Sequence, residues 1–282
     1  MTSQTEAIDR APALGSDPQE AGAGFLTATA QTARRTLLQF ARTPQLLAMP
    51  AINAVLFTII FRYVFGGAID PGGDIDYVDF LIPGFVAQVW LWNVMNIPAG
   101  IAEDSTSGVH DRLRSLPIPR AAVMAGRSLA DTLLNVYPLV ITLGLGFAVG
   151  FRTDAGASAV IAALGVILAA IFAFSWLFIG LGLVAGNAQS AQFLATLVVI
   201  PLTFVSGAFV PVDSMPGWLH WFAANQPVTV LINAVRSLML GGTDVAGIGH
   251  TTSYWVWLSL LWCAGIVALF SALTSARFAR TR

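Results

Sequence analysis

The sequence contains no lysine, and its fourteen cationic side chains are all arginines. A phosphate-binding P-loop needs a lysine that contacts the phosphates of the nucleotide. The chain therefore cannot hydrolyse ATP through a P-loop of its own.

Cysteine and histidine are almost as scarce. The one cysteine, Cys263, lies inside an apolar run, which excludes a disulfide framework and a thiolate metal site. A helical zinc site needs two histidines at positions i and i+4, together with a glutamate. His110, His220 and His250 are far apart in the sequence and do not form this pattern. The apolar runs hold no carboxylate pair and no nucleophile-elbow serine. We therefore expect no catalytic, cofactor or metal site, and no enzyme activity in this chain.

Charged residues make up only 10% of the chain, whereas hydrophobic residues make up 56% and the mean hydropathy is +0.74. This composition is too apolar for a soluble globular protein. A net charge of −1 without a basic stripe also gives nucleic acid nothing to bind. Six apolar runs have about the length needed to cross a bilayer: 46–65, 80–101, 130–149, 157–185, 193–209 and 254–273. The sequence predicts an all-α integral membrane protein with six transmembrane helices.

Residues 25–42 predict an amphipathic helix that ends before Pro44. Its apolar face would consist of Leu26, Ala30, Ala33, Leu37 and Ala41. The opposite face carries Arg35 and Arg42, which anionic headgroups of a membrane interface would attract. The alternative is a soluble helix that packs on a partner. Residues 1–24 combine Pro, Gly, Ala and mixed charge without an apolar core, so we expect a disordered tail.

Several polar side chains interrupt the predicted spans. Asn93 and Asn96 share one helix face, so they either hydrogen bond to another helix, which we favour, or contact a substrate. Gln88 and Ser206 are further candidates for a substrate pathway. Asp131, near the inner end of the third span, is expected to pair with Arg127 one turn earlier on the helix.

The segment 102–127 separates the second and third predicted spans and is the most charged patch of the chain. Its four arginines indicate the cytoplasmic face, because short cytoplasmic loops are enriched in basic residues. With six spans, eleven arginines lie on that side and only Arg62, Arg152 and Arg236 lie outside, which predicts two cytoplasmic termini. The segment either contacts a soluble partner or only sets the topology.

Residues 211–242 are half polar and rich in interfacial aromatic residues such as Trp218 and Trp221. Asn225, Gln226 and Pro227 separate two short helical stretches. The pattern predicts a re-entrant or surface helical hairpin on the outer side, which either caps a pathway or only anchors the chain.

Three stretches carry a family resemblance: FLIPGFVAQ at 80–88, AEDSTSGVHDRLRSLPIPRAAVMAGR at 102–127 and VSGAFVPVDSMPGWLHWFAANQPVTVLINAVRSLMLGG at 205–242. Together with the six spans, they make the chain resemble the permease (transmembrane) subunit of an ABC type-2 exporter, in the DrrB/NodJ-like branch. The resemblance covers nearly the whole chain after Phe25 and assigns 45–276 to one transmembrane domain, with 277–282 as a cytoplasmic tail.

The resemblance implies the export of an amphipathic drug, antibiotic or lipid across the bacterial cell (plasma) membrane. A separate nucleotide-binding subunit would bind ATP and magnesium and would push on a coupling helix within 102–120. The contact candidates by position are Glu103, Asp104, Gly108, Arg112 and Leu113. The resemblance also implies a dimer, with a second copy or a sibling permease, whose second and fifth spans line the pathway.

Two other functions stay open. A permease for polysaccharide or lipid-linked glycan would share this topology. An ion-driven secondary transporter is disfavoured, because the spans lack clear deep acidic residues and paired broken helices.

Overall fold

The computed structural model describes residues 24–66, 76–106, 120–153, 155–242 and 248–280, and the regular structure in these ranges is entirely helical. Four helical stretches in them are long and apolar enough to cross a bilayer: Tyr77–Glu103, Ala122–Ala148, Ala157–Val184 and Thr252–Thr274. Shorter apolar helices cover Ala48–Val64, Ala188–Phe204 and Pro227–Met239. The chain is therefore a multi-pass, all-α membrane protein.

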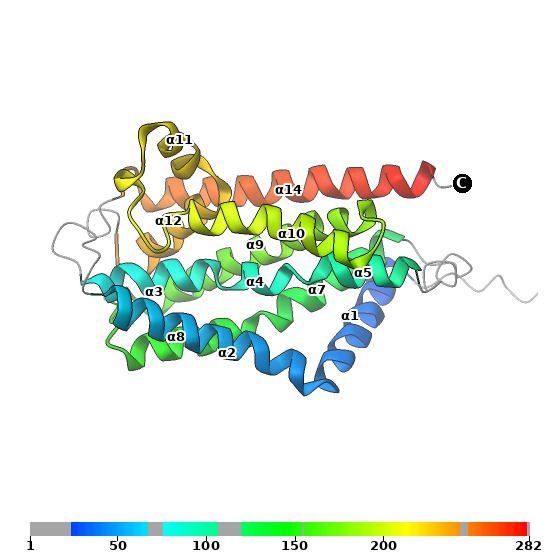
Figure 1. Ribbon diagram of the computed structural model, residues 1–282, viewed down its shortest axis with the longest axis horizontal. Coiled ribbons are helices and arrows are strands. Elements are labelled where there is room, and N and C mark those ends of the chain that lie inside the picture. The colour runs from blue at the N-terminus through cyan, green and yellow to red at the C-terminus, as the bar shows by residue number, and fades with distance from the viewer. Residues whose placement is uncertain (1–23, 67–75, 107–119, 154, 243–247, 281–282) are drawn as a thin grey trace, which may run out of the picture.

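The first two helices meet at a sharp turn. Helix α1 (Phe25–Ala41) crosses one end of the bundle, and α2 (Pro44–Ile60) runs away from it along the bundle (Figure 1). Pro44 occupies the first turn of α2, where the missing N–H costs no helical hydrogen bond. The helix then continues as a short π-helix, η1 (Phe61–Phe65).

The second predicted span consists of three helices in a row: α3 (Tyr77–Gln88), α4 (Trp90–Val94) and α5 (Ile97–Thr106). Pro98 explains the second break, because it cannot donate a hydrogen bond to the carbonyl of Val94. The predicted run 80–101 lies within this row, which extends five residues further to Thr106.

The third span is also broken, into α7 (Arg120–Leu134) and α8 (Val136–Ala148). Pro138 removes the hydrogen bond to the carbonyl of Leu134, at the point where the break occurs. The membrane-spanning stretch begins at Ala122, eight residues before the predicted start at residue 130. The charged segment 120–127 is helical because α1 packs along α7, so the apolar pattern alone does not mark where this helix begins.

Two long helices follow in the positions predicted for spans. Helix α9 (Ala157–Val184) matches its predicted run closely, and α14 (Thr252–Arg280) extends beyond 254–273 at its C-terminal end. Between them, α10 (Ala188–Phe204) begins five residues before the predicted run 193–209 and ends five residues before its end. Its start is fixed by Asn187, whose Oδ1 accepts a hydrogen bond of 2.8 Å from the Ser190 backbone N–H.

The predicted hairpin region contains a 3-10 turn, η2 (Val212–Ser214), followed by α11 (Gly217–Asn225) and α12 (Pro227–Met239). Figure 1 shows α11 at the end of the bundle opposite to α1 and to the C-terminal end of α14. Helix α12 is buried and packs against α3, α9 and α14. The two ends of the bundle therefore bear different helices, α1 at one end and α11 at the other.

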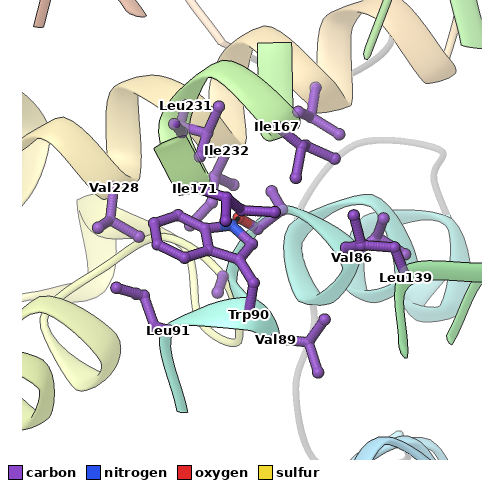
Figure 2. Close-up of a cluster of buried hydrophobic side chains, with 14 of the residues drawn as sticks. Val86, Val89, Trp90, Leu91, Leu139, Ile167, Ile171, Val228, Leu231 and Ile232 are labelled. Carbon is purple, nitrogen blue, oxygen red and sulfur yellow. Dashed lines mark hydrogen bonds between the residues drawn. The ribbon is translucent and has the colours of Figure 1, made fainter. Parts of the chain in front are cut away.

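Trp90 of α4 is among the largest fully buried side chains of the core. Figure 2 shows Ile171 of α9 beside its indole ring, with Leu231 and Ile232 of α12 close by. The indole N–H donates a 2.6 Å hydrogen bond to the carbonyl of Ala87, and the ring meets Phe174 edge to face at 5.2 Å. Trp90 thus fixes the broken second span against α9 and α12.

Helix α1 buries only part of the face that the sequence predicts to be apolar. Leu26 is 80% exposed, whereas Ala28, Ala33 and Thr36 are buried against α7. A Cβ atom at Gly126 of α7 would lie 2.5 Å from the carbonyl oxygen of Thr29, so the two backbones meet there. Close approach favours small residues in the contact, which leaves the larger leucine outside it.

Candidate functional site

A cavity of about 400 Å³ lies between α2, α4–α5 and α7–α8, with Phe40 from the end of α1 in its wall. We call it the polar cavity, because its lining includes Asn53, Asn93, Asn96, Arg127, Asp131 and Asn135. Apolar side chains such as Trp92 and Met49 complete the lining. A small-molecule pocket typically combines this size with a mostly apolar wall and a few polar groups.

The two helix breaks place the asparagines of the polar cavity opposite each other. Asn93 Nδ2 donates a 3.0 Å hydrogen bond to Asn135 Oδ1, and Asn135 Nδ2 donates a 2.8 Å bond to the carbonyl of Asp131. Asn96 Nδ2 makes a longer 3.4 Å contact with the carbonyl of Asn93. The interhelical hydrogen bond favoured from the sequence is therefore confirmed for Asn93. Its partner, Asn135, was missed.

Asp131 is buried in the same wall and forms the predicted pair with Arg127. The distance from Arg127 Nε to Asp131 Oδ2 is 3.5 Å, and the two side chains are 20% and 7% exposed. A buried charge needs an opposite charge nearby, so the pair makes the polar cavity neutral overall. Asp131 Oδ2 is fully buried and accepts no hydrogen bond from the described residues.

The other two pathway candidates lie together, away from the polar cavity. Gln88 of α3 and Ser206, just after α10, are both buried, and Ser206 Oγ lies 3.0 Å from Gln88 Oε1. The Ser206 hydroxyl is also 2.6 Å from the carbonyl oxygen of Thr203. This contact connects the second predicted span to the end of the fifth.

The coupling candidates are described only in part. Glu103 is exposed near the end of α5, at the end of the bundle that bears α1, and Asp104 follows it in the same helix. Gly108, Arg112 and Leu113 lie outside the described residues. Arg35 and Arg42 are exposed on α1 and just after it, and so are free of the contact with α7.

The sequence analysis misjudged Arg236 of α12, because it counted this residue only as an outside charge. Its side chain is buried, and its guanidinium donates hydrogen bonds of 3.0 Å from Nη2 to the carbonyls of Phe80 and Gly207. A single arginine in the apolar helix PVTVLINAVRSLM was the available signal. Arg236 thereby ties α12 to α3 and to the segment after α10.

The helix that precedes α12 is exposed. Trp218 and Trp221 of α11 are 82% and 74% exposed, and His220 Nε2 lies 3.2 Å from Asp213 Oδ1. The described residues contain no cluster of three or more histidine, cysteine or acidic side chains that could hold a metal ion.

The profile of the ABC-2 type transporter family matches residues 27–240, which include the polar cavity, Gln88, Ser206 and Arg236. The daunorubicin resistance ABC transporter permease protein DrrB1 of Streptomyces coeruleorubidus is 32% identical over 93% of this chain and 89% of its own length. A probable doxorubicin resistance ABC transporter permease protein, DrrC of Mycobacterium tuberculosis, is 25% identical over 94% of this chain and 93% of its own. The inner membrane transport permease YadH of Escherichia coli is 24% identical over 71% of this chain and 78% of its own. The broken, multi-pass helical bundle and these matches agree, and the chain belongs to the ABC-2 type transporter family.

Proposed function

We propose that the chain is the permease subunit of an ATP-driven exporter that moves an amphipathic drug, antibiotic or lipid out of a bacterial cell. The observation that carries this proposal is a match over nearly the whole chain to a permease named for daunorubicin resistance. A second relative is named for doxorubicin resistance. Such amphiphiles dissolve in the membrane. A multi-pass helical bundle can therefore bind them directly from the lipid.

The energy comes from a separate nucleotide-binding subunit that holds ATP and magnesium, since the chain has no lysine for a P-loop. This subunit contacts the end of the bundle that bears α1, through the segment that begins at Glu103 and Asp104 and includes Gly108, Arg112 and Leu113. Its closure moves that segment and, through α5, the broken second span. The permease itself transmits the movement and selects the substrate.

The topology has six spans, with the short helices α2 and α10 counted among them and α12 as the inner arm of an outer re-entrant hairpin. Helix α10 has 17 residues and rises about 26 Å, which is slightly less than the ~30 Å hydrocarbon core. The exposed tryptophans of α11 support an outer interfacial position for that helix. Both termini are then cytoplasmic, and Arg35 and Arg42 contact the inner membrane surface.

The permease acts as a dimer, with a second copy or a sibling chain. Large exposed side chains on α10 form a stripe with the 4-3-4 spacing of a helix contact: Phe193, Leu197, Ile200 and Phe204. The Gln88–Ser206 contact lies at the end of the same helix, which supports our proposal that these residues line the dimer pathway.

The coupling role is tested in the complex of permease and ATPase subunits. The double variant Glu103→Ala, Arg112→Ala is compared with Asp213→Ala, which removes an exposed acid near α11 at the opposite end. We expect the double variant to insert into the membrane but to lose export and drug-stimulated ATP hydrolysis, while the control keeps both. Unchanged export by the double variant would refute the coupling role. Export of a lipid-linked glycan without any export of drugs would show that the substrate is a glycan and not the proposed drug, antibiotic or lipid.

A further inference from the structure

The outward side of α1 carries a row of arginines. A groove of about 560 Å³ follows this side of the helix, and we call it the arginine groove. Its lining includes side chains that recur every three or four positions and so form one stripe along the helix: Gln31, Arg34, Arg35, Leu38, Gln39 and Arg42. All six side chains are exposed. The groove is therefore open to whatever lies outside the bundle at this end.

The positive charge of the arginine groove is not balanced within the part of the chain that the structure describes. Residues 21–69 contain no aspartate or glutamate. None of the three arginines of the groove forms a salt bridge with a described residue. Arginine donates paired hydrogen bonds that match a phosphate or a carboxylate. The groove therefore selects an anionic group.

A second, apolar row runs beside the arginine groove on the same helix. It consists of predicted apolar-face residues that the bundle leaves wholly or partly exposed: Leu26, Ala30, Leu37 and Ala41. Leu26 is 80% exposed, Leu37 is half-buried and the two alanines are exposed. Leu37 lies three residues after Arg34, and Ala41 lies three residues after Leu38, so the two rows are neighbours on the helix surface. Helix α1 thus presents cationic and apolar groups side by side.

The two rows together indicate a membrane lipid, and not a soluble acidic partner, as the occupant. An acidic protein surface would pair with the arginines but would leave the apolar row in water, which is unfavourable. A phospholipid supplies both a phosphate and an acyl chain. The groove also ends at Arg42, two residues before Pro44 begins α2, on which Ile52 and Leu56 are exposed apolar side chains. This continuity with a membrane helix places the groove at the depth of the lipid headgroups.

We propose that α1 binds an acidic phospholipid, with its phosphate in the arginine groove and an acyl chain along the row from Leu26 to Ala41. The lipid carries a net negative charge, because a zwitterionic headgroup would bring its own cation to the phosphate. The inference deepens the proposed membrane contact of Arg35 and Arg42, and it rests on the proposed function only in that α1 lies at the inner membrane surface. A Cβ atom at Gly126 of α7 would meet the backbone of α1, so the bound lipid also stabilises this close contact between the two helices.

Lipid binding is measured by native mass spectrometry of the full-length, delipidated permease in a neutral detergent. The probe is phosphatidylglycerol, and the matched control probe is phosphatidylcholine with the same two acyl chains. Neither ATP nor an ATPase subunit is present, so failure of this test is distinguishable from failure of the export proposal.

The groove variant is Arg34→Gln, Arg35→Gln. Both side chains are exposed, so the variant is expected to fold as the wild type does. The charge-matched control variant is Arg277→Gln, Arg280→Gln, which removes two arginines from the C-terminal end of α14, at the same end of the bundle as α1. Leu26→Gln tests the apolar row separately, without a change of charge.

We expect the wild type to bind phosphatidylglycerol in preference to phosphatidylcholine. The groove variant should bind phosphatidylglycerol about thirty-fold more weakly, because each arginine at an anionic lipid surface contributes roughly a factor of five. Leu26→Gln should weaken binding several-fold, since it removes apolar contact with the acyl chain. The control variant should bind as the wild type does. Phosphatidylglycerol should also raise the midpoint of thermal unfolding of the wild type more than that of the groove variant.

Equal binding of the two lipids by the wild type would overturn the proposal, as would equal binding of phosphatidylglycerol by the wild type and the groove variant. Equal losses in the groove variant and the control variant would also overturn it, because any arginines at this end would then suffice.

The N-terminal tail is a second anionic group in the chain, because it carries four acidic residues and one arginine: Glu6, Asp9, Asp17, Glu20 and Arg10. A variant in which the four acids are changed to their amides tests whether the tail occupies the groove. We expect this variant and the wild type both to bind phosphatidylglycerol. Binding by the tail variant alone would make the tail the occupant and would contradict the proposal.

Discussion

The guanidinium of Arg236 and the backbone and ring of Phe80 form one buried contact. Arg236 Nε and Nη2 donate hydrogen bonds of 3.3 Å and 3.0 Å to the Phe80 carbonyl, and the guanidinium carbon lies 3.7 Å from the centroid of the Phe80 ring. Nη2 also donates to Gly207. One side chain of α12 therefore donates hydrogen bonds to carbonyls from two other parts of the chain. The membrane interior contains no water that could donate these hydrogen bonds instead.

Replacing Arg236 with methionine should lower the free energy of unfolding by about 2 kcal/mol, because it removes the buried hydrogen bonds from the guanidinium to the carbonyls of Phe80 and Gly207. Arg236→Lys should restore little of this loss, since one ammonium cannot reproduce the planar fork of donors. Thermal unfolding of the detergent-solubilised protein measures the stability of both variants. Arg34→Met, on the exposed face of α1, is the control and should be neutral. A methionine variant as stable as the wild type would show that the arginine does not hold α12 in place.

Gly84 leaves the space that Arg236 occupies. A Cβ atom there would lie 2.8 Å from both the Ala208 carbonyl oxygen and Arg236 Nη2. Since the backbone carbonyl cannot move aside easily, Gly84→Ala should destabilise the protein by about 2 kcal/mol. Gly165→Ala is the matched control. A Cβ atom there meets nothing within 4 Å, so this substitution should not lower the stability. If both variants melt at the same temperature as the wild type, the close packing around Gly84 is not as described.

These two residues show what the sequence could and could not predict. Hydropathy places the membrane helices, and the i, i+4 spacing predicts the Arg127–Asp131 pair, because both depend on local pattern. The positions of Arg236 against Phe80 and of Asn93 against Asn135 depend on contacts across 156 and 42 residues of sequence. The helix boundaries at α5, α7 and α10 were misplaced for the same reason, since packing on a neighbouring helix extends or ends them independently of hydropathy.

Asn93 and Asn135 should show a coupling energy of about 0.6 kcal/mol in a double-mutant cycle with leucine substitutions, the typical size for hydrogen bonds between membrane helices. The unfolding free energies of the two single variants and of the double variant give this value directly. We expect this coupling because each single substitution already leaves the other amide without its hydrogen-bond partner. Strict additivity of the two single changes would mean that the 3.0 Å contact contributes nothing to stability.

The proposed dimer contact on α10 is accessible to cross-linking, because the chain has only one cysteine. In a Cys263→Ala background, Leu197→Cys should form an intermolecular disulfide in membranes, since Leu197 is 61% exposed within the stripe on α10. Ile161→Cys on α9, where the side chain is 68% exposed, provides the comparison and should stay monomeric. Efficient cross-linking through residue 161 with none through residue 197 would place the dimer contact on another face.

The most direct measurement is ATP-dependent uptake of a fluorescent anthracycline drug by proteoliposomes that contain this chain with or without an ATPase subunit of the ABC class. We predict uptake only when both proteins and magnesium–ATP are present, and none when an ion gradient replaces ATP. Transport by this chain alone under an ion gradient would contradict the central claim.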